Sequence, residues 1–459
     1  MKSYESYLGN TYWVQDNSFA SGGEGAIYDV HNYYNTVVKI YNPSKRTEHQ
    51  EKKLKTMLSV KLDDNVAKQF AWPIDIIYQN GSFVGFVMKK IQGVPLNVIN
   101  SDYYKDLPLN KKITIAKNLV VVSHNIHQTG NLIGDMNPNN ILVCPQTGLV
   151  SLIDCDSFHI TDSSKRATFR CEVAMAEYLA PCVSQKLAKG ESLKTAYLPT
   201  FTKASDNFSL AIHIFQLLMA GTHPFALAID STRSKNQEEL PQPSENIKKG
   251  IFPYDKCPEG FKLPIYALPF EALPETLRAL FIKCFSNGEY VAEHELFDAL
   301  CEYEAKLKTC KTNHNHEYRK GLRKCPYCSA EKSTAKMLGY KVKPKLSSAK
   351  SVSAKASPVG KFFFWTISLL LAVVWQIIGY HAVGFSNVFV EDIASFVGLS
   401  YQSLPMGYLN INCVCGLIAA FIYNCTTRKR MIRIKNYFFS QLFSIFGFLL
   451  GFLLMAYFT

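Results

Sequence analysis

Short runs of apolar residues predict β-strands at several places in the N-terminal half of the chain. The run at 36–41 surrounds a lysine, and the run at 83–88 is almost entirely apolar. Two further runs, at 141–143 and 149–153, are separated by a proline and a glycine. Because Pro and Gly favour turns, this pair predicts a hairpin of two short strands with polar groups at its ends.

Apolar residues at helical spacing predict several helices along the same part of the chain. These helices cover residues 46–60, 205–225, 277–286 and 294–307. Within 205–225, Gly221 and Pro224 form the terminating turn. Residues 226–275 are rich in proline and charge with little periodicity, which predicts an extended insert.

The C-terminal part of the chain has a different pattern. Lys, Ser, Ala and Pro dominate up to residue 361, which predicts a flexible basic linker at 333–361. Residues 362–385, 404–425 and 436–459 carry no formal charge. Each run is long enough to cross ~30 Å of hydrocarbon as a helix. Buried core helices are the alternative, but they would need a soluble domain around them, so we expect a membrane domain at 362–459 with three transmembrane helices.

Charge and cysteine content indicate where the parts of the chain lie. Much of the net charge of +13 falls in the linker and in the basic loop 426–435, whereas the loop between the first two runs contains Glu391 and Asp392. Positive loops stay inside, so we expect a multi-pass protein of the cytoplasmic membrane with its N-terminal part in the cytosol. Thirteen cysteines without framework spacing also favour a reduced compartment, and the N-terminus lacks the apolar core of a signal peptide.

The candidate chemistry surrounds the predicted hairpin. Asp135 precedes its first strand, Asn140 follows five residues later, and Asp154 comes directly after the second strand. Phosphoryl transfer needs such a set, because one carboxylate orients the attacking hydroxyl while an Asp and an Asn hold Mg²⁺ on the nucleotide phosphates. A polar hairpin in any α/β protein is the alternative reading of this stretch alone.

A glycine-rich turn lies earlier in the chain. Gly22, Gly23 and Gly25 precede the strand at 36–41, which contains Lys39. Glycines let the backbone approach phosphates and offer amide donors. A plain hairpin loop would explain the glycines by themselves, but not a lysine inside an apolar strand fourteen residues later.

At this point the sequence resembles the protein kinases. Asp135, Pro138 and Asn140 match the spacing of their catalytic loop, and Asp154 matches their metal-binding Asp. Gly22 and Gly25 fit the kinase pattern G-x-G-x-x-G-x-V, with Ala and Ile27 at two positions of that pattern. The resemblance covers residues 12–305, with six motifs in order, and its G-D-x-N-x-x-N and L-I-D-x-D-S-F motifs look like those of a bacterial group.

The resemblance implies an α+β, bilobal kinase-like domain at 1–305 that binds ATP and Mg²⁺. Its catalytic residues would be Asp135, Asn137 and Lys39. Its nucleotide-binding residues would be Gly22, Gly23, Gly25, Ile27, Lys39, Glu51, Met88, Lys90, Asn140 and Asp154, with Asn140 and Asp154 on Mg²⁺. Glu51, with Glu48 as the alternative, is the expected ion-pair partner of Lys39, and Met88 and Lys90 belong to the adenine-binding hinge. Asp206 would brace the catalytic loop or cap its helix.

Several positions depart from the family. Asn137 replaces the lysine that contacts the transferred phosphate in Ser/Thr kinases, and Asp156 replaces a glycine beside the metal-binding Asp, where it could itself bind metal. Cys182 replaces the glutamate of the A-P-E element, and Gly134 replaces the arginine that pairs with a phosphorylated activation segment. A membrane-tethered pseudokinase and a kinase of small molecules or lipids are therefore alternatives to a Ser/Thr-type protein kinase.

A Cys/His cluster follows the kinase-like domain, as it often does in the bacterial group. Cys325 and Cys328 are spaced so that both thiolates can bind one ion, and Cys310 with His316 would complete a structural zinc site in a ribbon-like module at 306–332. His314 is the alternative ligand, and reduced cysteines without metal are the alternative to a site.

The partners expected are a protein substrate and the lipid bilayer, and no nucleic acid, because no basic face is interleaved with aromatic residues.

Overall fold

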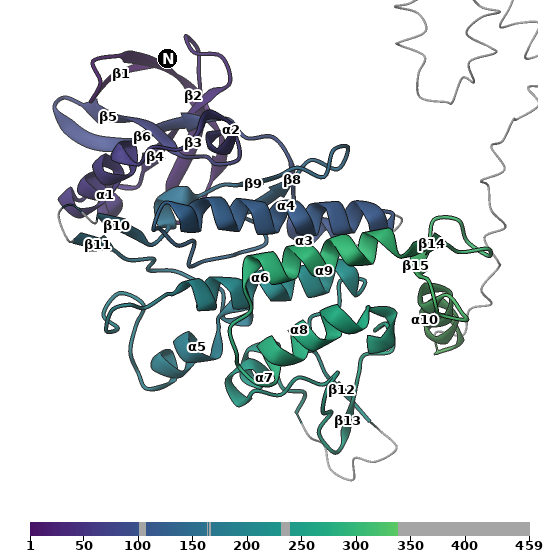
Figure 1. Ribbon diagram of the computed structural model, residues 1–459. Coiled ribbons are helices and arrows are strands. Elements are labelled where there is room, and N and C mark those ends of the chain that lie inside the picture. Colours follow the sequence, from purple (N-terminus) through teal and green to yellow (C-terminus); the bar gives the residue numbers. More distant parts are fainter. Residues whose placement is uncertain (101–106, 163, 165–166, 231–238, 338–459) are drawn as a thin grey trace, which may run out of the picture. The chain divides into compact units, whose positions relative to one another are not determined.

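The N-terminal part of the chain is a closed antiparallel barrel of six strands in the order β1-β2-β3-β4-β6-β5 (Figure 1). The computed structural model describes residues 1–100, 107–162, 164, 167–230 and 239–337. The strands are β1 (Lys2–Ser6), β2 (Thr11–Ser21), β3 (Gly25–Val30), β4 (Thr36–Tyr41), β5 (Pro73–Gln79) and β6 (Ser82–Lys89). The predicted strands at 36–41 and 83–88 are confirmed as β4 and the centre of β6.

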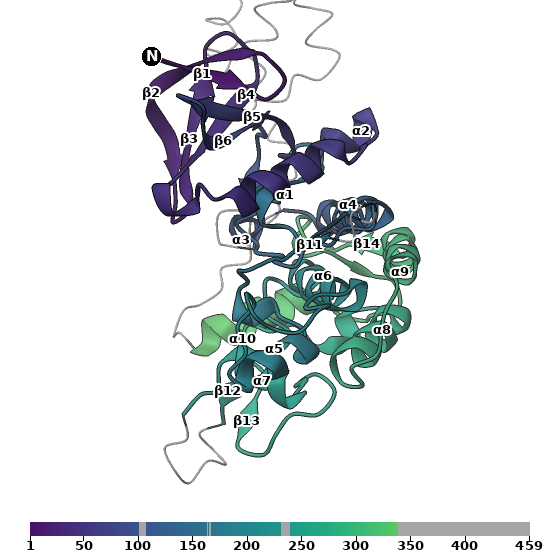
Figure 2. The ribbon, with the colours of Figure 1, turned by 90° about the vertical axis from the view of Figure 1, so that its left-hand side faces the viewer.

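Helix α1 (Glu48–Ser59) packs on the barrel and confirms the helix predicted at 46–60. Thr47 caps its N-terminus by accepting a hydrogen bond from the backbone N of Gln50 at 3.1 Å. Leu54 and Met57 are fully buried against the barrel. Figure 2 shows α1 between the barrel and the helices that follow, so it adjoins both parts of the fold. Helix α2 (Asp64–Ala67) then leads into β5.

The longest helix of the described residues, α4 (Leu109–Gln128), was not predicted from the sequence. It is reached through β7 (Val94–Pro95) and α3 (Leu96–Ile99). Its buried residues lie on several sides because α4 packs against α6, α9 and β9. Burial on so many sides blurs the one-faced spacing by which an amphipathic helix is recognised.

The predicted hairpin is confirmed, as β8 (Ile141–Val143) and β9 (Val150–Leu152). Ile141 pairs with Leu152, and β7 pairs with the other edge of β8 to complete a three-stranded sheet. Gly148 has a φ of 81° in the turn, a backbone conformation that residues other than glycine rarely adopt. The hairpin therefore fixes the separation of the two candidate loops at its ends.

Helices make up most of the remainder. They are α5 (Pro181–Ala188), α6 (Lys203–Leu218), α7 (Pro243–Lys249), α8 (Glu275–Phe285) and α9 (Glu293–Ala305). The predicted helices within 205–225, 277–286 and 294–307 are thus confirmed, with small shifts of their ends. A capping box between Thr202 and Ser205 starts α6.

The region 226–275 is not simply extended, as we expected. Within its described residues it contains α7, β12 (Ala228–Ile229), which pairs with β13 (Phe261–Lys262), and the 3-10 turn Phe270–Ala272. Phe252 is buried and lies edge-on to Phe215 of α6, at 6.0 Å between ring centroids. The segment is held by burial of isolated aromatic residues, which leaves no periodic pattern in the sequence.

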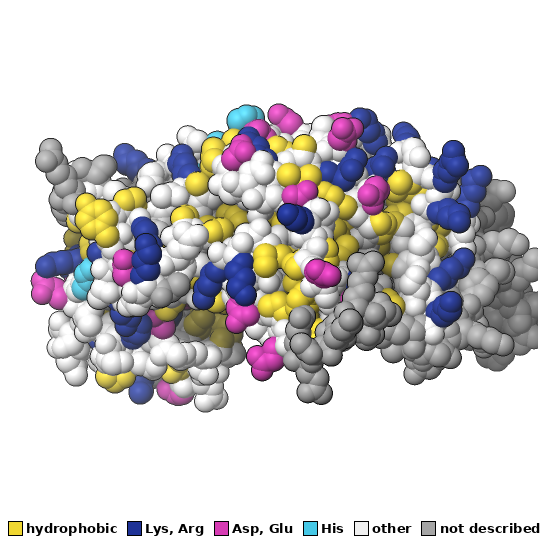
Figure 3. Space-filling view, turned by 90° about the horizontal axis from the view of Figure 1, so that it is seen from below, with side chains coloured by type: hydrophobic (Ala, Val, Ile, Leu, Met, Phe, Trp, Pro, Cys, Tyr) yellow, Lys and Arg dark blue, Asp and Glu magenta, His cyan; other side chains and the backbone are white. Residues whose placement is uncertain are grey.

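The Cys/His segment consists of β14 (Leu307–Thr309), which pairs with β15 (Glu317–Arg319), and α10 (Pro326–Met337). Because α10 continues to Met337, the flexible linker predicted from 333 is wrong at its start. Tyr327 and Ala330 anchor α10 by packing against the main core. Figure 3 shows Lys and Arg side chains gathered at the end where Figure 1 places these elements. Exposed Lys and Arg residues of this segment include Lys311, Lys320, Arg323, Lys324 and Lys332.

Within the described part of the chain, no helix is both long and apolar enough to cross a membrane. The three predicted spans at 362–385, 404–425 and 436–459 lie outside the described residues. So does most of the predicted linker.

Candidate active site

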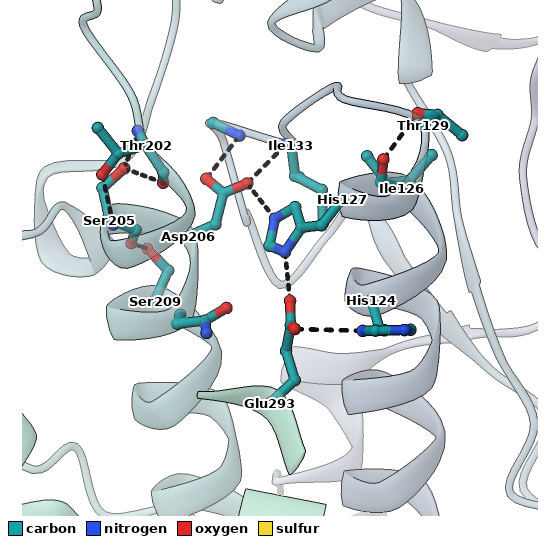
Figure 4. Close-up of polar contacts among 12 residues, drawn as sticks. His124, Ile126, His127, Thr129, Ile133, Thr202, Ser205, Asp206, Ser209 and Glu293 are labelled. Atoms are coloured by element: carbon teal, nitrogen blue, oxygen red, sulfur yellow. Dashed lines mark hydrogen bonds and ion pairs between the residues drawn. The ribbon is translucent and has the colours of Figure 1, made fainter. Parts of the chain in front are cut away.

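The loop that carries Asp135 connects α4 to β8, and Asp206 of α6 holds its backbone. The Asp206 carboxylate accepts hydrogen bonds from the backbone N of Ile133 at 2.7 Å and of Gly134 at 3.0 Å (Figure 4). The expected bracing role of Asp206 is thus what the structure shows, while Thr202 takes the capping role. Gly134 has a φ of 76°, and a Cβ there would lie 2.7 Å from Cys171 Cβ, so glycine is required.

Two residues that the sequence did not reveal complete this support. The imidazole of His127 on α4 bridges Asp206, at 3.0 Å, and Glu293, the first residue of α9 (Figure 4). Burial alone would lower the pKa of His127, but its hydrogen bonds to Asp206 and Glu293 raise it to about 9. The hydrogen bond from His127 lowers the pKa of Glu293 to about 2. A histidine cation therefore joins three helices beneath the catalytic loop.

Asp135 is nearly buried, with 8% of its surface exposed. One carboxylate oxygen accepts a hydrogen bond from the backbone N of Met175 at 3.2 Å. Burial raises the pKa of Asp135 to about 6, although the Met175 N–H opposes the change. A carboxylate with a pKa close to neutral pH is suited to accept a proton from a hydroxyl group.

Asn140 and Asp154 are brought together by the backbone of the hairpin. The backbone N of Ile153 donates to the carbonyl O of Asn140 at 2.9 Å, which places Asp154 one residue beyond this contact. Asn137 forms a tight turn, because its side-chain oxygen accepts from the backbone N of Asn139 at 2.9 Å. Carboxylate and amide oxygens are donors that Mg²⁺ prefers, so the pair Asn140 and Asp154 fits that ion.

Lys39 of β4 reaches across to Asp154 and to a second carboxylate, Asp156. Its Nζ lies 2.7 Å from Asp154 Oδ1, and 3.0 and 2.7 Å from the two oxygens of Asp156. Burial alone would lower the pKa of Lys39, but Asp156 and Asp154 outweigh it and hold the pKa above its ordinary value. Lys39 is therefore a fixed cation at the point where the barrel meets the hairpin.

The predicted ion pair between Lys39 and Glu51 is wrong. Glu51 accepts hydrogen bonds from Lys55 Nζ at 2.6 Å and from the hydroxyl of Tyr78 at 2.7 Å. The alternative, Glu48, pairs with Lys52 at an exposed position. Asp156, rather than Glu51 of α1, is the carboxylate that pairs with Lys39. A carboxylate buried as deeply as that of Asp156 needs a cation in contact with it.

The glycine-rich turn between β2 and β3 lies beside Lys39. Ile27 is paired with Lys39 across the β3–β4 ladder, and Glu24 Oε2 lies 3.5 Å from Lys39 Nζ. A Cβ at Gly25 would lie 2.3 Å from the carbonyl O of Ile40, so only glycine fits. A Cβ at Gly22 or Gly23, by contrast, would meet no atom within 4 Å. The backbone at these two glycines therefore has space beside it for a ligand.

The expected hinge residues lie at the end of β6. Met88 is 6% exposed and belongs to the main core. Lys90 Nζ pairs with Asp29 Oδ1 at 2.6 Å and lies 4.6 Å from the ring centre of Phe19. The side chain of Lys90 thus ties the hinge to the barrel.

Two groups of side chains could hold a metal ion among the described residues. The first is Glu24, Asp154 and Asp156, whose carboxylates surround Lys39 Nζ. The second is Cys310, His316, Cys325 and Cys328, whose ligand atoms lie within 4.8 Å of one another.

The donor set of the second group fits zinc. The Sγ atoms of Cys310 and Cys328 are 3.7 Å apart, and His316 Nδ1 lies 3.4 Å from Cys328 Sγ and 3.7 Å from Cys325 Sγ. The 3.7 Å between the Sγ atoms of Cys310 and Cys328 is too long for a disulfide, whose S–S bond is about 2.05 Å. Three thiols and one imidazole make a complete tetrahedral set for zinc, and the histidine is His316 rather than His314.

The fold and the site around Lys39 define a protein kinase-like chain. Its β-barrel lobe supplies Lys39, and its helical lobe supplies Asp135, Asn140 and Asp154. No family model matches the chain. It is a distant homologue of protein kinase YegI from Escherichia coli K12, with 27% identity over 329 residues, or 68% of this chain and 47% of the relative. YegI of E. coli O157:H7 is also 27% identical over 329 residues, which are 48% of that relative. The chain spans about half the length of these curated relatives.

Proposed function

We propose that the chain is a membrane-anchored Ser/Thr-type protein kinase that transfers the γ-phosphate of ATP to a protein hydroxyl. One observation carries the proposal: Lys39 and Asp154, which are 115 residues apart, meet at 2.7 Å beside the loop that carries Asp135 and Asn140. Phosphoryl transfer needs a cation, a metal-binding carboxylate and a proton acceptor in this arrangement.

The side chains would then divide the work of the reaction. Asp135 would orient the acceptor hydroxyl and take its proton, for which its pKa of about 6 is suited. Lys39 would hold the nucleotide phosphates beneath Gly22 and Gly23, and Asn140 and Asp154 would bind Mg²⁺. The bound Mg²⁺ would neutralise negative charge on the transferred phosphate.

Asn137 would lie beside the transferred phosphate. Its amide can donate a hydrogen bond there but adds no charge. Lys39 and Mg²⁺ would therefore carry the positive charge of the site, and this is a reason to expect a slower transfer step than in kinases with a lysine at this position.

The membrane part of the proposal rests on the sequence. Three uncharged runs between residues 362 and 459 and the basic loop 426–435 support a multi-pass anchor in the cytoplasmic membrane, with the kinase domain on the cytosolic side. A Cys₃His set with four protein ligands supports structural rather than catalytic zinc at the preceding segment.

The decisive experiment uses the full chain in detergent or nanodiscs with labelled ATP, Mg²⁺ and a mixture of acceptor proteins. We expect label on protein Ser or Thr residues, lost with Asp135→Asn and kept with Asp298→Asn. The second variant is a matched control, because Asp298 is exposed on α9.

Each other outcome has its own meaning. Nucleotide binding without transfer would contradict the kinase and favour a nucleotide-sensing pseudokinase. Label that appears only in small molecules or lipids would contradict the protein-substrate part.

A further inference from the structure

The buried carboxylate of Asp156 holds Lys39 in place. Both of its oxygens accept hydrogen bonds from Lys39 Nζ, at 3.0 and 2.7 Å, and the hydroxyl of Tyr41 donates to Oδ2 at 2.6 Å. Asp156 is 2% exposed and Tyr41 is 1% exposed. Lys39 and Tyr41 are two residues apart on β4, so their side chains lie on the same face of the strand.

The same phenol connects this arrangement to α1. Gln50 Nε2, in the first turn of α1, donates a hydrogen bond to the Tyr41 hydroxyl at 2.8 Å. A chain of hydrogen bonds thus runs from α1 through Gln50, Tyr41 and Asp156 to Lys39. The next residue of the helix, Glu51, points away to Lys55 and Tyr78.

We propose that Asp156, Tyr41 and Gln50 are positioning residues that aim Lys39 at the nucleotide phosphates and couple its position to that of α1. This inference rests on the proposed kinase function. A neutral amide and a phenol, rather than a glutamate on the helix, link α1 to the lysine. Displacement of α1 would remove the Gln50 hydrogen bond and loosen Tyr41, and the amino group would lose its fixed orientation.

Direct binding of Mg²⁺ by Asp156 is the competing role. Each of its oxygens already accepts a hydrogen bond, and the carboxylate is enclosed by Lys39 and Tyr41. Asp154, whose side chain is 33% exposed against 1% for Asp156, is open to an incoming ion. The two roles differ in what they do to the Mg²⁺ requirement and to nucleotide affinity, and this difference is the basis of the test.

The test compares two tyrosines that each lose only a hydroxyl. Tyr41→Phe removes the hydrogen bond to Asp156, whereas Tyr78→Phe removes the hydrogen bond to Glu51. In the full chain we expect Tyr41→Phe to lower kcat/KM for ATP by about tenfold, because a buried hydrogen bond to a charged group is lost. Tyr78→Phe should stay within about twofold of the parent.

Two further variants separate the positioning role from the metal role. Asp156→Asn should weaken the binding of a fluorescent ADP analogue without Mg²⁺ and leave the Mg²⁺ concentration for half-maximal activity unchanged. Gln50→Ala should act in the same direction as Tyr41→Phe on kcat/KM, and thermal unfolding checks that each variant is folded.

Clear results would overturn the inference. Equal effects of the two Tyr→Phe variants, or a larger loss with Glu51→Gln than with Asp156→Asn, would restore the helix glutamate as the partner of Lys39. A raised Mg²⁺ requirement with unchanged nucleotide affinity would make Asp156 a metal ligand. If the parent transfers no phosphate at all, the proposed function fails, while binding of the ADP analogue to the parent and to Asp156→Asn still decides the role of Asp156.

Discussion

In the candidate active site, burial moves the pKa values of single side chains away from their ordinary values. Asp135 is the clearest case, since burial raises its pKa to about 6. As a proton acceptor it must be deprotonated, so its active fraction grows as pH rises through that value.

The first prediction concerns this titration. We expect kcat of the full chain to fall by about tenfold for each pH unit below about 6, and to level off above pH 7. Rates at saturating ATP from pH 5 to pH 8, with nucleotide binding measured at each pH, check it. A rate that stays constant down to pH 5 would show that Asp135 does not act as the proton acceptor.

At the scale of elements, α4, α6 and α9 are joined by one histidine. The folded pKa of His127 is about 9 against an ordinary 6.5, so its charge stabilises the fold. That contribution is fully present below pH 6.5 and is lost as pH rises through about 9. The pKa of Glu293 is lowered from 4.5 to about 2, so its contribution is present above pH 4.5 and is lost as pH falls through about 2.

The second prediction follows from this pairing. His127→Gln should destabilise the protein by about 3 kcal/mol at pH 6, because Asp206 and Glu293 lose the cation between them. The difference from the parent should shrink as pH rises past 9. Thermal unfolding from pH 6 to pH 10 measures it, with His124→Gln as the control, since His124 contacts the same Glu293 from a half-exposed position. Equal losses in the two variants would contradict the central role of His127.

The segment after Asp156 carries possible phosphorylation sites, including Thr168 in β11 (Ala167–Phe169). Gly134 offers no side chain to bind a phosphate there. Arg170 donates to the carbonyl O of Ala196 and to Thr200 Oγ1, at 3.4 Å for the latter, so it is engaged elsewhere.

The third prediction is that activity does not depend on phosphorylation of this segment. Phosphatase-treated protein should keep its initial rate, with mock-treated protein as the control, and Thr168→Ala should be near neutral. A tenfold fall in either case, about 1.4 kcal/mol of transition-state stabilisation, would reveal a phosphate switch.

At the scale of the whole molecule, the Cys/His segment is built into the helical lobe. Glu317 of β15 accepts a hydrogen bond from the backbone N of Asn110 at the start of α4, at 2.8 Å. Tyr327 lies between Cys325 and Cys328 in sequence, and its hydroxyl donates a hydrogen bond to the carbonyl O of Leu218 at the end of α6, at 3.4 Å. If the segment binds zinc, removal of the ion should therefore also affect the start of α4 and the end of α6.

The fourth prediction concerns this metal. Purified full chain should contain about one zinc, lost when Cys325 and Cys328 are both changed to Ser. The variant should melt at a lower temperature and exchange amide hydrogens faster at the start of α4. The double variant of the exposed Cys182 and Cys257 is the matched control and should keep the metal. Elemental analysis that finds no zinc in fresh protein would remove the site but not the kinase.

The fifth prediction concerns membrane topology. A reporter fused after Thr459 should be active only outside the cytosol, and one inserted at Arg430 only inside. The reverse pattern would mean that residues 404–425 do not cross the membrane.

The sequence alone determined the local order of the kinase-like site. Strands β4 and β8 were predicted at their observed bounds, because a short apolar run between turn residues has few alternatives. The spacing of Asp135, Asn140 and Asp154 likewise follows from a hairpin of fixed length. These features depend on neighbours in the chain, so they can be read along it.

Only the tertiary structure decided which side chains meet across the chain. The sequence favoured Glu51, with Glu48 as the alternative, as the partner of Lys39, whereas the structure pairs Lys39 with Asp156. His127 lies on a helix that the sequence did not predict, and only the structure shows that it bridges Asp206 and Glu293. The choice in each case depends on burial and on competing donors such as Tyr41 and Tyr78. These are set by the packing of segments far apart in sequence, and no local pattern records them.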